Sequence, residues 1–545
     1  FTNSEIYCKG PLLDAAQNAF IFNDSKSFVD MKLKYPPEVV LSAFRQLNLT
    51  YNGNIPAQVV TKFVFKNFEN PGSEFENWLP EDWTESPRFL AKIADENLRS
   101  WASDLNQLWK VLGRKMVNDV FTNSSQYSII PVKNPVIVPG GRFREFYYWD
   151  SYWVVRGLIL SEMHSTVKGM LQNFLQIVED FGFVPNGGRI YYTRRSQPPF
   201  LIAMVKDYFE STGDIGFLKL ALPTLEKEYK FWVSHRSIQV NGYTLNYYGS
   251  EVNQPRPESY REDKNAIKNL NPDDARTLMG HLTSACESGW DFSSRWAGTE
   301  YSEKTNVLQQ LVTRNVLPVD LNSIMALNER TMAEFYTTIG NLTEADKYLE
   351  NYSKRVMAIE ALMWNENDGS YYDYVLSDNS PNRKYFASNA NPLWTKCFPS
   401  NIDATERENR IYNYLKKTGV LDYPGGIPTS LSTSGEQWDF PNAWPPLVHM
   451  IIEGLASSNS TTLQSEALQQ ARKWISGNYR AYVKTNFMFE KYDVTVEDGV
   501  AGSGGEYDVQ VGFGWTNGVV MSLLDRYGDI LTGIGCSMTS GKSSK

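Results

Sequence analysis

Cysteine is scarce in this 545-residue sequence, and its spacing is not that of a metal site. No CxxC pair occurs among Cys8, Cys286, Cys397 and Cys536, so a zinc site is not expected. Cys8 and Cys536 lie near opposite ends of the chain and could form a disulfide if the ends meet. Free buried thiols explain these cysteines equally well.

Histidine is equally scarce, which limits the catalytic chemistry open to the chain. None of the four histidines lies inside the aromatic loop motifs described below, although His281 and His449 are near two of them. No Gly-x-Ser-x-Gly elbow and no P-loop of the required glycine spacing are present. Catalysis by a Ser/His/Asp triad and phosphate binding by a P-loop are therefore not predicted.

Long apolar runs and an excess of basic residues are also missing. No run of about 18 apolar residues occurs, so no transmembrane helix is expected in this chain. The sequence has 53 Lys and Arg against 62 Asp and Glu, a net charge of −9. That balance argues against a nucleic-acid partner.

Aromatic residues, by contrast, are abundant, with 15 Trp and 31 Tyr. Their rings offer an apolar face with a polar group at the edge, which suits the C–H faces and hydroxyls of a sugar. A large aromatic core would also account for the total. Aromatics interleaved with charged residues are harder to explain as core.

Six Asn-x-Ser/Thr sequons favour a secreted glycoprotein, although chance supplies a few in a chain rich in Asn. N-glycans are expected at some of Asn23, Asn48, Asn123, Asn341, Asn351 and Asn459. No signal peptide is visible at Phe1, as in a processed secreted chain. We expect an extracellular protein, or one on the outer face of the plasma membrane if a C-terminal anchor has been removed.

Most of the chain has the three- and four-residue apolar spacing of helices. The expected helical segments are 87–121, 147–163, 166–181, 198–211, 215–235, 319–339, 344–364, 409–418, 443–457, 463–485 and 514–527. Strands are expected only at 127–133 and 243–248. About a dozen paired helices with long polar loops between them predict an all-α toroid, an α/α barrel. A helical solenoid is the alternative, but the sequence shows no repeat.

The expected organisation is one large domain with accessory ends. Residues 1–35 form an N-terminal extension packed on the barrel, residues 36–530 form the barrel, and residues 531–545 form a flexible tail. Long irregular loops in a compact domain are usually functional. They are predicted at 134–146, 182–199, 249–296, 366–400, 421–442 and 486–513.

Five of these regions place carboxylates and arginines among Trp, Tyr, Phe and Gly. They are Pro139–Trp153, Val184–Pro199, Pro255–Tyr260 with Glu287–Trp296, Gly435–Pro446, and Phe489–Asp493 with Gly502–Tyr507 and Gly512–Asn517. Glycoside hydrolysis needs two carboxyl groups, and an apolar neighbour such as Trp keeps one of them protonated. Asp291, after Gly289-Trp290, has the setting of the acid. Glu490 and Glu506 compete for the role of base.

Each of these residues also has an ordinary structural explanation. A single acid is more often a helix cap or part of a salt bridge. Arg142, Arg195 and Arg256 could bind sugar hydroxyls or orient a carboxylate. They could equally form surface ion pairs worth about 0–1 kcal/mol.

Several of these motifs resemble those of one family, the trehalases (glycoside hydrolase family 37 type). Pro139-Gly-Gly-Arg-Phe-Arg-Glu-Phe-Tyr-Tyr-Trp-Asp-Ser-Tyr152 and Gln437-Trp-Asp-Phe-Pro-Asn-Ala-Trp-Pro-Pro446 resemble its two signatures. Ser288–Trp296, Gly504–Tyr507 and Gly512–Gly518 fit the same family, in the same order. The opening Ile6–Leu13 is similar to animal, especially insect, members.

The resemblance implies an (α/α)6 barrel that hydrolyses α,α-trehalose to two glucoses, with inversion and without a metal or other cofactor. Asp291 would be the general acid and Glu490 the general base. Substrate contacts would come from Arg142, Phe143, Trp149, Asp150, Asn186, Arg195, Gln197, Arg256, Glu258, Gly289, Trp438 and Glu506. Two departures, Ser503 in the glycine run and Val511 before Gly512, concern loop detail.

Inversion requires roughly 6.5–9.5 Å between the two carboxyl groups, and we predict that spacing for Asp291 and Glu490. Two other interpretations stay open. Another barrel glycosidase or a disaccharide phosphorylase would share the toroid and the acid. A non-catalytic sugar-binding relative would be expected to lack one of the two carboxylates.

Overall fold

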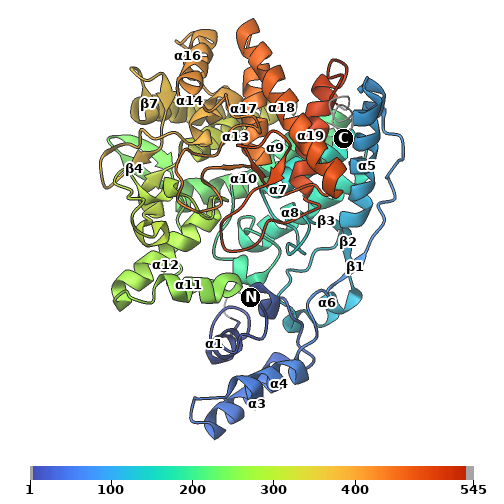
Figure 1. Ribbon diagram of the computed structural model, residues 1–545, viewed down its shortest axis with the longest axis vertical. Helices are drawn as coiled ribbons and strands as arrows, with labels where there is room; N and C mark the ends of the chain where they lie inside the picture. Colours follow the sequence, from blue (N-terminus) through green and yellow to red (C-terminus); the bar gives the residue numbers. More distant parts are fainter. Residues whose placement is uncertain (1–3, 535–545) are drawn as a thin grey trace, which may run out of the picture.

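Six inner helices form a closed circle within residues 4–534, the part of the chain that the computed structural model describes. Each packs against the next, and the last packs against the first. In ring order they are α7 (Asp150–Leu160), α9 (Leu201–Thr212), α13 (Val319–Thr338), α15 (Asn391–Thr395), α17 (Pro445–Ala456) and α19 (Gly514–Tyr527). Figure 1 shows this bundle in the upper part of the view, with α3 (Pro37–Thr50) and α4 (Ala57–Asn67) extending below it.

An outer helix precedes each inner helix along the chain. The outer helices are α5 (Glu96–Leu112), α8 (His164–Phe181), α10 (Ile215–His235), α14 (Leu342–Met363), α16 (Ala404–Lys417) and α18 (Thr461–Thr485). Inner helices have neighbours on nearly every side, so α17 buries ten of its twelve residues. The outer α16 buries six of fourteen, the pattern of a helix with one face in water. The predicted α/α barrel is confirmed.

Side-chain caps explain where several outer helices begin. Asp95, Asp214, Asn341 and Asp403 each accept a hydrogen bond from a backbone N–H in the first turn that follows. Such caps satisfy donors that a helix start would otherwise leave free. The cap at Asp403 also corrects the expected helix at 409–418, because α16 begins five residues earlier, at Ala404.

Other sequence predictions of secondary structure were wrong in detail. The expected helix 87–121 is divided into the 3-10 helix η1 (Arg88–Lys92), α5, strand β2 (Gly113–Met116) and α6 (Asn118–Thr122). The expected strand 127–133 contains only an isolated bridge from Ile129 to Arg189. The region 249–296, expected to be a loop, contains α11 (Tyr260–Ala266) and α12 (Pro272–Glu287). Helices α3 (Pro37–Thr50) and α4 (Ala57–Asn67) were not anticipated.

The strands are short and mostly join loops. They are β1 (Phe75–Asn77), β3 (Val136–Ile137), β4 (Ser237–Val240), β5 (Tyr243–Asn246), β6 (Val316–Leu317), β7 (Trp364–Asn365), β8 (Ser370–Tyr371), β9 (Tyr374–Val375), β10 (Ser380–Pro381), β11 (Asn442–Ala443), β12 (Tyr492–Asp493) and β13 (Val500–Ala501). The expected strand 243–248 corresponds to β5, paired with β4. The sheet β11-β12-β13 holds two of the predicted functional loops together.

The N-terminal segment is anchored by a buried group of charges. Helix α2 (Lys26–Val29) carries Lys26, whose Nζ lies 2.5 Å from Asp30 and 2.8 Å from Glu145. Arg189 pairs with Asp30, Glu145 and Glu74, and all five side chains are buried. The exact domain boundaries stay a prediction. Cys536 and most of the expected tail lie outside the described residues.

Candidate active site

One pocket collects residues from all five aromatic, charged loops of the sequence. Every predicted site residue is in its wall: Asp291, Glu490, Arg142, Phe143, Trp149, Asp150, Asn186, Arg195, Gln197, Arg256, Glu258, Gly289, Trp438 and Glu506. These positions are spread over 365 residues of chain between Arg142 and Glu506, so it is the barrel that brings them together. Glu145, the other acid of the first motif, is instead buried in the charge cluster with Lys26.

Asp291 lies in the loop after α12, next to the buried rings of Trp290 and Phe292. Burial disfavours its ionised form and raises the pKa of its carboxyl to about 7. The guanidinium groups of Arg256 and Arg195 oppose this rise, and the carboxylate of Glu506 adds to it. A carboxyl with this pKa holds a proton close to neutral pH, as a general acid must.

The tight turn before Asp291 depends on Gly289, whose φ is +78°. A Cβ at this position would lie 2.7 Å from the indole of Trp149. The glycine therefore lets the backbone of the acid loop touch an aromatic wall of the pocket.

Glu490 is held by its own loop and by a neighbouring one. The Tyr507 hydroxyl donates to Oε1 of Glu490 at 2.8 Å, and the backbone N of Glu490 donates to the Gln510 carbonyl at 3.0 Å. The Trp515 indole donates to the Glu490 carbonyl at 3.1 Å. Burial raises the pKa of Glu490, while the Lys491 ammonium and the Tyr507 hydrogen bond limit the rise.

Glu506 is bound to a pocket arginine. It accepts from Arg256 Nη2 at 2.8 Å and from Ser259 Oγ at 3.0 Å. Arg256 is itself held by the buried Asp263, which accepts from its Nε and from its backbone N. The chain thus places a fixed cation and a second carboxylate near Asp291.

Arg195 occupies a similar position in another wall. Its Nε donates to Asn186 Oδ1 and its Nη2 to Glu258 Oε1, both at 2.7 Å. Among the described residues, Glu258 Oε2 and Arg142 Nε are buried and bond no protein atom. Buried polar atoms are normally paired, so these two are suited to hydrogen-bonding a ligand in the pocket.

Asp150 begins α7, and its carboxyl is buried in the pocket wall. Burial, followed by the nearby carboxylates of Glu490 and Asp291, raises its pKa well above the usual range. The Trp149 backbone N donates to Gln197 Oε1 at 3.2 Å, which ties this helix start to the loop that carries Arg195.

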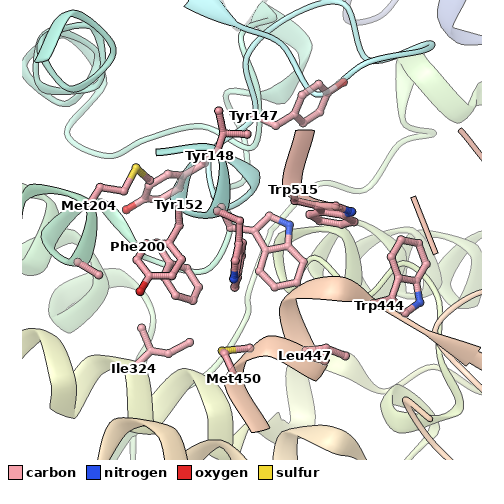
Figure 2. Packing of buried hydrophobic residues seen from close by; sticks show 14 of the residues in the cluster. Tyr147, Tyr148, Tyr152, Phe200, Met204, Ile324, Trp444, Leu447, Met450 and Trp515 are labelled. Carbon is pink, nitrogen blue, oxygen red and sulfur yellow. The ribbon is translucent and has the colours of Figure 1, made fainter. Parts of the chain in front are cut away.

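Stacked tryptophans form the apolar part of the wall. Trp438 lies face to face with Trp444, with ring centroids 3.8 Å apart and planes 1° apart. Trp515 stands perpendicular to Trp444, and Figure 2 shows both within the buried aromatic and aliphatic cluster of the barrel. Such a rigid, apolar surface suits the C–H face of a sugar ring.

Some pocket residues were not predicted from the sequence. They are Lys26, Tyr147, Tyr192, Ser259, Trp444, Tyr507, Phe513 and Trp515. Most belong to the aromatic motifs, where the sequence alone does not distinguish residues that line the pocket from residues of the core. Lys26 lies in the N-terminal segment, 119 positions from its partner Glu145, so only the fold shows that it lines the pocket.

Neither a metal site nor a membrane span is found in the described part of the chain. Within residues 4–534, no group of three or more His, Cys, Asp or Glu side chains is placed to hold a metal ion. No helix over the same range is both long and apolar enough to span a bilayer.

The chain is similar to known proteins along most of its length. The sequence model of the family described as "Trehalase" matches residues 20–528. A trehalase of Apis mellifera is 47% identical over 97% of this chain and 85% of its own. A trehalase of Homo sapiens is 46% identical over 97% of this chain and 90% of its own. In fold, a neutral trehalase of Saccharomyces cerevisiae has a TM-score of 0.59, at 24% identity over 73% of this chain and 75% of its own.

Proposed function

The chain belongs to the trehalase family and is a glycoside hydrolase that cleaves trehalose; we propose that it does so by inversion, with Asp291 as general acid and Glu490 as general base. The observation that carries this proposal is the different setting of the two carboxyls in one pocket. Asp291 has a pKa of about 7, whereas Glu490 has an ammonium group and a phenol hydrogen bond to stabilise its ionised form.

In this mechanism Asp291 gives its proton to the oxygen between the two sugars as the bond to the anomeric carbon breaks. Glu490 takes a proton from a water molecule, whose oxygen forms the new bond to that carbon from the opposite face. One glucose therefore leaves as the β anomer and the other keeps the α configuration. Water must fit between Glu490 and the sugar, which is why we predict the wider carboxyl spacing of roughly 6.5–9.5 Å.

The other pocket residues are proposed to bind the substrate. Arg142 and Glu258 have buried polar atoms that bond no protein atom among the described residues. Arg195, Asn186, Arg256 and Glu506 are fixed by one another and can hydrogen-bond hydroxyls without further ordering. Trp149 and Trp438 would pack against sugar faces, and Phe143 would close one side.

Two substitutions test the assignment. Asp291→Asn and Glu490→Gln should each lower kcat on trehalose by about 10³-fold or more while sugar binding is retained. Anomer-resolved NMR of the unaltered enzyme should show one α- and one β-glucose at early times. Turnover near wild type in both variants, or two α-glucoses, would refute the mechanism. Phosphate-dependent release of glucose 1-phosphate would instead indicate a phosphorylase.

We also propose that the protein is extracellular or on the outer face of the plasma membrane, with N-glycans. Of the six sequon asparagines, Asn48 is half-buried and the other five are exposed: Asn23, Asn123, Asn341, Asn351 and Asn459. Expression in eukaryotic cells, followed by enzymatic removal of N-glycans, tests this. A secreted form whose mass does not change on that treatment would contradict glycosylation.

A further inference from the structure

Two hydrogen bonds join the loop of the proposed base to the loop of the proposed acid. Lys491, the residue after Glu490, donates from Nζ to Gln437 Oε1 at 2.7 Å. Gln437 Nε2 donates to the Asp291 carbonyl at 2.6 Å. The path from one catalytic residue to the other therefore runs through only two side chains, although 199 positions separate Asp291 from Glu490 in the sequence.

Gln437 is a fixed link in this path. Its carbonyl accepts from Asn442 Nδ2 and from Trp444 Nε1, both at 2.9 Å. Its side chain is covered by Gly505, where an added Cβ would lie 2.8 Å from Gln437 Cδ. Because this side chain is buried and hydrogen-bonded at both ends, it holds the Glu490 loop and the Asp291 loop at a fixed position relative to each other.

Lys491 is fixed as firmly, and none of its surface is exposed. Its Nζ lies over the ring of Trp444 at 5.1 Å and over that of Tyr507 at 5.7 Å. A third contact reaches the Gly504 carbonyl at 3.4 Å. Its own carbonyl accepts from Gly502 N at 3.0 Å, next to strands β12 and β13.

The ammonium also acts on the two carboxyls through its charge. Burial lowers the pKa of Lys491, and the carboxylates of Glu490 and Asp291 oppose that change. The groups that face Glu490 are Lys491, Arg142, Tyr507 and Asp150. Lys491 is the strongest of those that favour the ionised base, ahead of Arg142.

We propose that Lys491 is a positioning residue of the reaction, which fixes Glu490 relative to Asp291 through Gln437 and keeps the base ionised. The proposal rests on the roles proposed above for those two carboxyls. It assigns Lys491 two separable functions. The link through Gln437 sets geometry, and the charge sets the pH range over which the base works.

The first test is Lys491→Met, which keeps the length of the side chain but removes the charge and the donor. We expect kcat to fall about 10²-fold, the effect of misplacing a reacting group by roughly 1 Å, with KM within about threefold of wild type. The acidic limb of the kcat/KM profile should move to higher pH, because the pKa of Glu490 rises when the cation is lost. Lys491→Arg should recover most of the pH profile but less of kcat.

A second variant separates geometry from charge. Gln437→Met breaks the link and leaves the ammonium in place, so kcat should fall while the acidic limb stays within about 0.2 pH units of wild type. The double variant should lose less than the product of the two single losses, because both break the same link.

Lys396→Met is the matched control. The Lys396 ammonium donates to the Glu408 carboxylate at 2.7 Å and to the Gly454 carbonyl at 2.8 Å, and neither of these partners lines the pocket. Its loss should lower the melting temperature without changing kcat or the pH profile. This control identifies effects that come from stability alone.

The outcomes are distinct. Full kcat and an unmoved acidic limb in folded Lys491→Met would overturn the inference. If Lys491→Met does not fold, Gln437→Met and Lys491→Arg still test the inference. Unchanged kcat in both of these variants would overturn it as well. Failure of the proposed function itself would appear elsewhere, as retained turnover in Asp291→Asn and Glu490→Gln.

Discussion

Arg256 holds Glu506 in the pocket wall, with 2.8 Å between Nη2 and Oε1, and both charges act on the pKa of Asp291 in opposite directions. Arg256 lowers that pKa by favouring the carboxylate, and Glu506 raises it by repulsion. The pKa of the proposed acid is therefore set by burial first and by this ion pair second.

Replacing Glu506 should consequently move the basic limb of the pH profile. Activity requires protonated Asp291, so in the unaltered enzyme kcat/KM should fall as pH rises through about 7. Glu506→Gln removes the repulsion, lowers the pKa of Asp291, and should shift this limb by about 0.5–1 unit to lower pH. A pH series of kcat/KM checks it. A limb that stays in place or moves to higher pH would contradict the assignment of Asp291.

Gly289 gives a second prediction, on local geometry. Gly289→Ala should lower kcat/KM by about tenfold or more, because the added Cβ would displace Trp149 and the acid loop with it. Gly213→Ala is the control: its φ is +67°, but nothing lies within 4 Å of the new Cβ. That variant should cost about 1 kcal/mol of stability from backbone strain and leave kcat/KM unchanged. Equal activity losses in the two variants would show that strain alone is responsible.

The sequence predicts the barrel and the catalytic motifs because both are local signals. Helical periodicity is visible over a dozen residues, and Trp438 or Gly289 can be recognised within its own motif. What it could not predict depends on contacts between distant segments. The division of 87–121 follows from β2 pairing with β1 and β3.

Lys26 is a pocket residue that the sequence could not predict for the same reason. On the sequence it is one charged residue in a polar segment, and only the fold buries it beside Glu145. Lys491 is similar, because its partner Gln437 lies 54 positions away. Helix α12 is different, because its signal is local: Leu278, Leu282 and Ala285 have helical spacing, and α12 buries eleven of its sixteen residues. The prediction of a loop over 249–296 missed that signal.

The charge cluster around Arg189 leads to a prediction on stability. Arg189→Met would leave Asp30, Glu74 and Glu145 buried with Lys26 as their remaining cation. Removing one partner of a buried ion network costs about 3–5 kcal/mol, so the free energy of unfolding should fall by at least that amount. Urea denaturation measures it. Arg88→Met, which breaks an exposed pair with Glu162, should cost about 0–1 kcal/mol. Similar losses in both variants would mean that the cluster does not anchor the N-terminal segment.

His449 on α17 leads to the last prediction, on acid stability. It is fully buried, its Nδ1 accepts from the Trp153 indole at 3.2 Å, and burial lowers its pKa to about 3. In the unfolded chain its pKa is about 6.5, so between those values the unfolded state binds a proton that the folded state excludes. Stability should therefore decline as pH falls below about 6.5, by roughly 1.4 kcal/mol per pH unit from this residue.

His449→Gln isolates that contribution, because glutamine can still accept from Trp153 but does not titrate. Between about pH 6.5 and 4.5 the variant should lose about 2–3 kcal/mol less stability than the unaltered protein. Thermal unfolding at several pH values measures the difference. If His449→Gln left the slope of stability against pH unchanged, burial of His449 would not be the cause of the acid sensitivity.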